Sequence, residues 1–248
     1  MGFPGGPNCD MLKKTAPGGR RNLPKGADRM RIKWYGHSCF LLSTDGGTRV
    51  LTDPCAPETG YRLADIEADV VTCSHGHYDH NYIAAVRGAP QVVDTAGGHV
   101  LGAGGGSITG VPTWHDGDGG AKRGPNLVFI LEVDGLRVVH LGDLGHVPDA
   151  AQAAAIGRPD VLFLPVGGTY TIDAAGAAQT AALLRPRRIV PMHYRTERLT
   201  FPLDGPEPFL AALAARGVPV RRLEGSECEL AAPVPEGPEA LLFACPTE

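Results

Sequence analysis

The chain alternates short apolar runs with turns rich in Gly, Pro and Asp. In the run over residues 31–43, apolar Ile32 and Trp34 alternate with polar neighbours, the period of two that is typical of a half-buried strand. Similar runs cover residues 49–54, 68–74, 91–95, 107–111, 127–143, 160–168, 187–193 and 218–224. The pattern therefore predicts many short strands, with the last of them at 218–224.

Two Ala-rich stretches, residues 148–156 and 173–184, have the composition of helices. The second ends before Pro186, which cannot continue a helix, and a further helix is predicted after Pro206. Strands and helices do not alternate regularly along the chain. The pattern therefore favours an α/β (α+β) fold in which two packed sheets carry helices on the outside.

Residues 1–29 differ from the rest, because they hold ten Gly or Pro residues and no periodic apolar pattern. This composition predicts a flexible N-terminal tail, followed by one domain over residues 30–248. No apolar stretch approaches the roughly 18 residues that cross a bilayer, and the N-terminal segment lacks the apolar core of a secretory signal. We therefore expect a cytoplasmic protein without a membrane partner.

The charge balance of the chain argues against one class of partner. Twenty-three Lys and Arg against 27 Asp and Glu give a formal net charge of −4, so a polyanion-binding surface and a nucleic-acid partner are not expected. The six cysteines include no C-x-x-C pair. They predict reduced thiols rather than a disulfide scaffold.

Two segments of the chain share one plan. Residues 39–54 (CFLLSTDGGTRVLTDP) and 127–143 (LVFILEVDGLRVVHLGD) each read as an apolar strand, an Asp-Gly turn, a second strand and an Asp just past its end. The similarity of two hairpins by chance is one interpretation. The other is that two related β halves deliver Asp53 and Asp143 to a shared edge.

The segment HGHYDH (residues 75–80) concentrates the candidate chemistry, because four potential metal ligands follow an apolar strand directly. Imidazole and carboxylate groups suit Zn, Mn and Fe. In extended backbone His75 and His77 point to the same side and can hold one ion, while a turn presents Asp79 and His80 a few ångströms away. A polar loop that is His-rich by chance is the weaker alternative.

Four ligands do not complete two metal sites, since each ion usually takes about three protein ligands. Three further candidates each follow a predicted strand: His115, Asp143 and His193. Strand ends that share one edge of the sheets would bring all three to the HGHYDH loop.

The H-x-H-x-D-H motif with a later His, Asp and His resembles the signature of the metallo-β-lactamase superfamily. WYGHSCFLL, TDP, HLGD, PVGGTYTID and PMHY resemble the L-ascorbate-6-phosphate lactonase-like branch, so that the resemblance spans about residues 30–195. It implies an αββα sandwich with the site at one edge. Because small members of the family often assemble, it also leaves a homo-oligomer open.

The resemblance also implies the ligand sets. Carried over position by position, the first ion is held by His75, His77 and His115. The second is held by Asp79, His80 and His193, and Asp143 bridges the pair. The implied cofactors are two divalent metal ions, with Zn as the first choice and Mn or Fe as alternatives.

Two cations about 3.5–4 Å apart lower the pKa of a shared water and polarise a carbonyl or phosphoryl oxygen. Asp79 or Asp143 could then receive the proton of the water. His37 is a further catalytic candidate that could bind substrate or shuttle a proton, with packing against Trp34 as the equal alternative. Asp53 is expected to orient a ligand imidazole through its second nitrogen.

These observations predict a metal-dependent hydrolase with a small-molecule substrate: an ester, lactone, amide or phosphoester. A di-iron oxidoreductase on the same scaffold is one alternative, but such proteins resemble H-x-E-x-D-H, whereas this chain has His77. A phosphodiesterase or nuclease is another, although nucleases of this kind usually carry a large insertion or a basic clamp. A metal-binding protein without catalysis is disfavoured by the intact ligand set.

Overall fold

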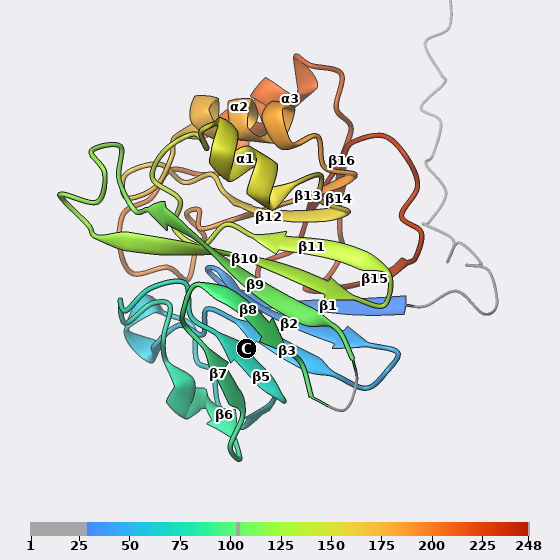
Figure 1. Ribbon diagram of the computed structural model, residues 1–248. Coiled ribbons are helices and arrows are strands. Elements are labelled where there is room, and N and C mark those ends of the chain that lie inside the picture. Colours follow the sequence, from blue (N-terminus) through green and yellow to red (C-terminus); the bar gives the residue numbers. More distant parts are fainter. Residues whose placement is uncertain (1–28, 103–104, 248) are drawn as a thin grey trace, which may run out of the picture.

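The computed structural model describes residues 29–102 and 105–247, which form two large β-sheets and three α-helices (Figure 1). The first sheet has the strand order β15-β1-β2-β3-β5-β7. Its strands are β1 (Arg29–Gly36), β2 (Cys39–Thr44), β3 (Arg49–Thr52), β5 (Val70–Thr72), β7 (Gln91–Val93) and β15 (Glu227–Ala231). Strands β15, β1, β2 and β3 pair antiparallel, and β3, β5 and β7 pair parallel.

The second sheet has the order β14-β16-β13-β12-β11-β10-β9-β8. Its strands are β8 (Gly97–Val100), β9 (Ser107–Trp114), β10 (Pro125–Val133), β11 (Leu136–His140), β12 (Val161–Pro165), β13 (Arg188–Met192), β14 (Val220–Arg222) and β16 (Glu239–Leu242). Strands β8 to β11 are antiparallel, and β11, β12, β13 and β16 are parallel. A small ribbon pairs β4 (Ile66–Glu67) with β6 (Val86–Arg87).

Three helices cover the outer face of the eight-stranded sheet: α1 (Ala150–Ile156), α2 (Ala174–Leu184) and α3 (Glu207–Ala214) (Figure 1). Helix α1 begins with a capping box, in which the side chain of Asp149 accepts from the backbone N–H of Gln152 and the side chain of Gln152 accepts in return. Helix α2 ends at Leu184 and is followed by Arg185 in a left-handed conformation. The helix thus ends before Pro186, as the sequence predicts.

The main core lies between the two sheets, and strand β2 shows how the sequence builds it. Phe40 and Leu42 belong to the cluster between the sheets, whereas Cys39 and Leu41 belong to a second cluster on the other face of the strand. The Phe40 ring lies 4.4 Å, centroid to centroid, from the Phe163 ring on β12. Each such fully buried apolar side chain contributes about 1.5–3 kcal/mol to stability.

The second cluster covers the outer face of the six-stranded sheet. Two short 3-10 helices, η1 (Pro57–Thr59) and η2 (Ile83–Ala85), lie in the segments that supply it, and within the described residues no α-helix lies in those segments. The predicted sandwich of two mixed sheets with outer helices is thus confirmed. Its helical layer is thick on one side and reduced to 3-10 turns on the other.

The two hairpins expected from the internal similarity are also present, since β2 and β3 pair in one sheet and β10 and β11 in the other. The prediction that 218–224 forms the last strand was wrong. Strands β15 and β16 follow it, and β15 returns to pair with β1, with Ile32 opposite Cys228. Residues 227–231 (ECELA) form a short segment without a β-branched or aromatic side chain, so the strand signal of their sequence was weak.

The predicted N-terminal tail lies outside the described residues except for Arg29, which opens β1 rather than ending the tail. Among the described residues, no helix combines the length and apolar character needed to span a membrane.

Candidate metal centre

The segments with the predicted ligands meet at one edge of the sandwich. The HGHYDH loop follows β5, and His115, Asp143 and His193 follow β9, β11 and β13. His115 Nε2 and His193 Nε2 lie 3.3 and 3.2 Å from Asp143 Oδ2, and His80 Nε2 lies 3.2 Å from Asp143 Oδ1. The structure thus brings all seven predicted side chains together, while their role as ligands stays a prediction.

The first group of potential ligands consists of His75, His77 and His115, whose nearest ring nitrogens lie within 4.8 Å of one another. The ring centroids of His75 and His77 are 4.5 Å apart, and those of His77 and His115 are 5.2 Å apart. His77 is exposed at the surface, so the group opens toward solvent. This is the set implied for the first ion.

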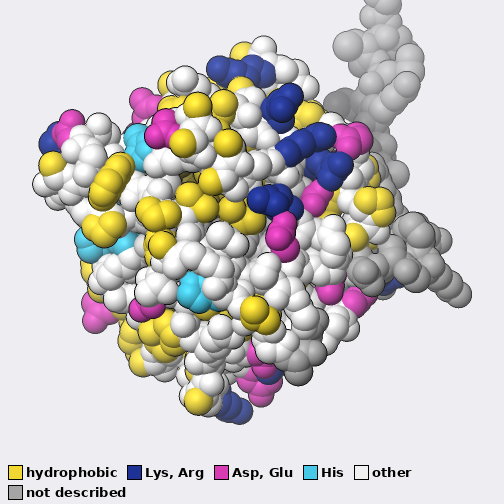
Figure 2. Space-filling model, in the orientation of Figure 1, with side chains coloured by type: hydrophobic (Ala, Val, Ile, Leu, Met, Phe, Trp, Pro, Cys, Tyr) yellow, Lys and Arg dark blue, Asp and Glu magenta, His cyan; other side chains and the backbone are white. Residues whose placement is uncertain are grey.

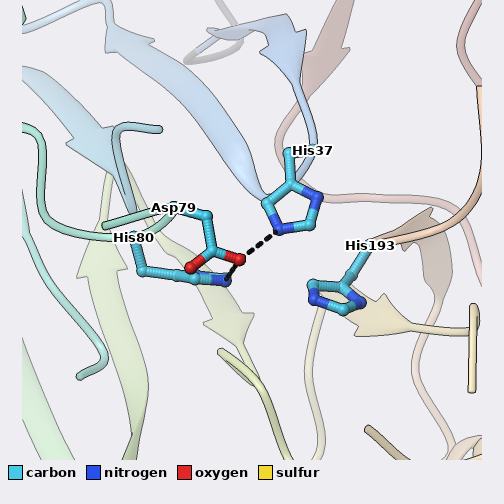
Figure 3. A group of neighbouring side chains, drawn as sticks. All are labelled: His37, Asp79, His80 and His193. Carbon is cyan, nitrogen blue, oxygen red and sulfur yellow. Dashed lines mark hydrogen bonds and ion pairs between the residues drawn. The ribbon is translucent and has the colours of Figure 1, made fainter. Parts of the chain in front are cut away.

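The second group contains the set implied for the other ion and one residue more. Its members are His37, Asp79, His80 and His193, all buried, with their ligand atoms again within 4.8 Å (Figure 3). His37 Nε2 lies 3.2 Å from Asp79 Oδ2, and His80 Nε2 lies 3.4 Å from the same oxygen. Four side chains can therefore surround one ion in this group.

Asp143 stands between the two groups. Its Oδ2 faces His115 of the first group and His193 of the second, and its Oδ1 faces His80. Burial alone would raise the pKa of Asp143, but His193 and His80 outweigh it and hold that pKa well below its usual value. The carboxylate is therefore ionised at neutral pH and can serve both groups.

The cluster passes a test of fit for metal ions. Among the described residues, most buried side-chain nitrogen and oxygen atoms that make no hydrogen bond belong to this cluster. They are His37 Nδ1, His75 Nε2, His80 Nε2, His115 Nδ1, Asp143 Oδ1 and both ring nitrogens of His193. Leaving buried polar atoms without partners costs about 1–3 kcal/mol each. Cations held in the cluster would give partners to the four of these atoms that face it, His75 Nε2, His80 Nε2, His193 Nε2 and Asp143 Oδ1. The donor set therefore suits divalent ions.

Asp53 orients His80, as its position after β3 predicts. Its Oδ2 lies 2.9 Å from His80 Nδ1, and its two oxygens also accept from the backbone N–H and the hydroxyl of Ser74 at 2.8 and 2.6 Å. Burial opposes ionisation of Asp53, but His140 and His80 lower its pKa below the usual value. With Nδ1 engaged by Asp53, His80 directs Nε2 toward Asp79 and Asp143.

The backbone is strained at three of these residues. His37, Asp53 and His193 have φ values of +51°, +39° and +51°, in the left-handed region that non-glycine residues rarely occupy. Such conformations persist only where surrounding structure imposes them. They are consistent with strand ends that turn sharply to aim side chains at one point.

Gly142 lets Asp143 reach the centre. Its φ is +55°, and a Cβ at this position would lie 2.4 Å from Asn126 Oδ1 and 2.6 Å from Ser74 Cβ. Asn126 in turn accepts from the backbone N–H of Asp143 at 2.8 Å and donates to the carbonyl of Leu141 at 3.0 Å. Sequence reasoning missed Asn126, because nothing local distinguishes it from an ordinary polar residue at a strand start.

His37 joins the centre rather than packing against Trp34. Its ring lies 4.3 Å from the His193 ring and 5.4 Å from the Phe201 ring, centroid to centroid, and Trp34 Nε1 donates only to the carbonyl of His37. Burial, with the neighbouring His193, lowers the pKa of His37 to about 4. The imidazole is therefore neutral at physiological pH and free to bind a cation.

The other imidazoles divide by their neighbours. Burial, followed by the effect of His80, lowers the pKa of His75 to about 3, and the pKa of His115 is lowered mainly by burial. For His80, burial is outweighed by the carboxylates of Asp143 and Asp79, which raise its pKa well above the usual value. In the metal-free protein a proton on His80 thus occupies part of the place that a cation would take.

The remaining histidines have local partners. His140 Nε2 faces the carbonyl of Ser38 at 2.9 Å, and its Nδ1 accepts from the backbone N–H of Gly142 at 3.2 Å. His146 Nε2 accepts from the backbone N–H of Trp114 at 3.3 Å, and His99 lies by Thr95. None of the three belongs to a ligand group of the described residues.

A cavity of about 520 Å³ opens above the cluster. His77, Asp79, His115, Asp143 and His193 line its floor, and Tyr78, Lys122, Arg123, Tyr170 and Phe201 complete it. Tyr170 thus lies in the wall of the cavity. Lys122, Arg123 and Phe201 were not predicted, since only tertiary structure brings their loops to the cavity.

The comparisons with known proteins agree with this geometry. The family model described as "Beta-lactamase superfamily domain" matches residues 31–193, which include every member of both ligand groups. A UPF0173 metal-dependent hydrolase of Archaeoglobus fulgidus is 34% identical over 223 residues, covering 77% of this chain and 94% of the relative. A UPF0173 metal-dependent hydrolase of Anaeromyxobacter sp. is 33% identical, covering 81% and 87%.

A solved structure from Thermotoga maritima, named as a candidate zinc-dependent hydrolase of the metallo-β-lactamase superfamily, matches with a TM-score of 0.70 and 39% identity. The match covers 86% of this chain and 98% of that one. The metallo-hydrolase Igni18 of Ignicoccus hospitalis, 24% identical with a TM-score of 0.63, shares the fold. The chain therefore belongs to the metallo-β-lactamase superfamily and, within it, to the UPF0173 metal-dependent hydrolases.

Proposed function

We propose that this hydrolase uses two divalent metal ions and a metal-activated water to cleave a small ester, lactone, amide or phosphoester. The observation that carries the proposal is the pair of ligand groups joined by Asp143, whose two oxygens lie 3.2–3.3 Å from imidazoles of both groups. A carboxylate placed between the two groups in this way can bridge two neighbouring cations.

His75, His77 and His115 would hold the first ion, and Asp79, His80 and His193 the second. Zinc is the preferred metal because most of these ligands are imidazoles, with manganese or iron as alternatives. Bound there, two ions would supply an acidified water and stabilise the charge that develops on a carbonyl or phosphoryl oxygen.

Asp79 is the better placed of the two carboxylates to take a proton. Its side chain is 12% exposed and lines the cavity, whereas that of Asp143 is 2% exposed and surrounded by imidazoles. His80 and His37 lower the pKa of Asp79 despite its burial, so this carboxylate is ionised at neutral pH. His37, 3.2 Å from Asp79 Oδ2, can hold that carboxylate in place and pass its proton on.

The cavity supports a small-molecule substrate, since about 520 Å³ is within the usual range of small-ligand pockets. On the face drawn in Figure 2, Lys and Arg side chains gather at the upper right, with Asp and Glu side chains beside them. The formal net charge of −4 supports the expectation that nucleic acid is not the substrate. The cytoplasmic location and the absence of a membrane partner stay predictions, as does any assembly into oligomers.

The test compares His77→Ala with His99→Ala, a histidine on β8 that lies outside both ligand groups. Purified wild-type protein should contain close to two equivalents of Zn, Mn or Fe by elemental analysis and hydrolyse at least one lactone, ester, amide or phosphodiester of a broad panel. His77→Ala should lose metal and activity, and His99→Ala should keep both. Wild-type protein that is folded, metal-free and inactive would overturn the proposal, and iron with oxygen consumption would favour the di-iron alternative.

A further inference from the structure

A loop beside the cavity is organised by one buried carboxylate. Asp116, only 4% exposed, accepts from the backbone N–H groups of Asp118, Gly120, Lys122 and Arg123 at 2.8–2.9 Å. Four hydrogen bonds to one side chain fix the path of the loop between His115 and β10. The side chains of Lys122 and Arg123 are thereby presented at the cavity wall in a defined position.

Arg123 is the cation of this loop for which the described residues supply no acidic partner. Lys122 forms an ion pair with Asp118. In the described part of the chain, Arg123 forms no ion pair with a carboxylate. Its Nη2 donates to the carbonyl of Thr169 at 3.3 Å, and its guanidinium lies 5.5 Å from the centre of the Tyr170 ring.

These contacts position Arg123 without neutralising it. A guanidinium presents five N–H donors in a planar fork, and the carbonyl of Thr169 uses one of them. The cation–π contact with Tyr170 further holds the guanidinium beside the cavity. The remaining donors are suited to a planar or tetrahedral oxyanion, which Arg binds bidentately.

We propose that Arg123 binds an anionic group of the substrate, a carboxylate or a phosphate, at the end remote from the bond that is cleaved. The proposal rests on the proposed function, since the metal cluster on the cavity floor would hold the reacting end. Tyr78, Tyr170 and Phe201 line the same cavity and supply apolar surface for the part in between. The substrate class is therefore a small molecule with a hydrolysable bond at one end and a negative charge at the other.

The experiment uses metal-loaded protein and hydroxamates, whose head group chelates divalent ions. Three matched series end in a carboxylate, a phosphonate or a neutral carboxamide, each over a short range of chain lengths, and binding is measured by calorimetry. Wild-type protein should bind the best carboxylate or phosphonate about 10- to 100-fold more tightly than the matched carboxamide. The preferred anionic end distinguishes a carboxylate from a phosphate substrate.

Arg123→Gln should abolish the preference while leaving carboxamide binding and metal content unchanged. Arg87→Gln, at an exposed arginine that pairs with Asp65 and Glu67 and does not line the cavity, should keep the preference. If Arg123→Gln weakened all three series alike, Arg123 would only tie its loop to Thr169, and the proposal would be overturned. Wild-type protein that binds neither metal nor carboxamide would overturn the proposed function, and this inference with it.

Discussion

Asp53 Oδ2 lies 2.9 Å from His80 Nδ1, although the two residues are 27 positions apart in the chain. The pair connects the hairpin of β2 and β3 to the HGHYDH loop, which follows another strand of the same sheet. Because Asp53 engages one nitrogen of the ring, the other nitrogen is the one that faces the cluster. A substitution of Asp53 therefore tests whether this contact orients His80 for metal binding.

We expect Asp53→Asn to lower metal affinity about 10- to 100-fold, because an amide has the shape of the carboxylate but not its charge. Competition with a chromophoric chelator would measure the change. Asp65→Asn is the matched control, since Asp65 forms only an exposed ion pair with Arg87. Equal affinities of Asp53→Asn and wild type would show that His80 needs no such partner.

His37 should contribute to one of the two metal sites. It lies with Asp79, His80 and His193 in a group of four potential ligands. The group of His75, His77 and His115 has only three members. We expect His37→Ala to weaken one equivalent of Co²⁺ about tenfold or more and to alter its visible absorption, while the other equivalent is unaffected. An unchanged spectrum with reduced activity would instead assign His37 to proton transfer alone.

The metal-free protein should lose stability as the pH falls from about 6.5 toward 4. The folded-state pKa values of His37 and His75 are depressed to about 4 and about 3, mainly by burial. The unfolded chain takes up protons at the ordinary histidine pKa of about 6.5, and the folded chain does so only at lower pH, so acid favours unfolding in this window.

The raised pKa of His80 affects stability at higher pH. The stabilisation that protonated His80 contributes to the folded protein is lost as the pH rises above about 6.5. Urea unfolding of chelator-treated protein at a series of pH values would measure both effects. A midpoint that is constant between pH 6.5 and 4 would contradict the assignment of neutral, buried imidazoles. Metal-loaded protein should resist acid until the ligands take up protons and release the ions.

Gly142→Ala should destabilise the protein far more than the same substitution does at a left-handed glycine whose surroundings have space for a Cβ. Its φ of +55° alone costs an alanine about 1–2 kcal/mol, and the added Cβ would also lie 2.4 Å from Asn126 Oδ1. Gly217→Ala isolates the first cost, because Gly217 has φ +72° with no atom within 4 Å of an added Cβ. Chemical denaturation of both variants should give the larger loss for Gly142→Ala, and similar losses would disprove the steric argument.

Much of the fold and of the cluster could be predicted because their signals are local. The apolar runs of β2, β10 and β12 are short and rich in residues that favour strands, and HGHYDH holds four potential ligands in six residues. The confirmed family resemblance rests on the same motifs. The convergence of His115, Asp143 and His193 followed from their shared position after strands.

What could not be predicted depends on contacts between distant segments. The sequence favoured neither a catalytic role for His37 nor packing against Trp34. The position of His37 beside Asp79 and His193 arises only when β1, the HGHYDH loop and β13 come together. Arg123 belongs to no recognisable sequence motif. The role proposed for it depends on its contacts with Thr169 and Tyr170, which are distant in the chain. Asp116 alone left a trace, since an Asp followed by GDGG is typical of a side-chain-capped turn.

The pairing of β1 with β15 has a consequence for how the chain matures. During synthesis β1 emerges long before β15, and its outer hydrogen-bonding edge stays open until residues 227–231 follow and pair with it. Contacts so remote in sequence form slowly, and an open edge invites pairing with other chains. Truncation before residue 227 should therefore yield aggregates even though every potential metal ligand is still present.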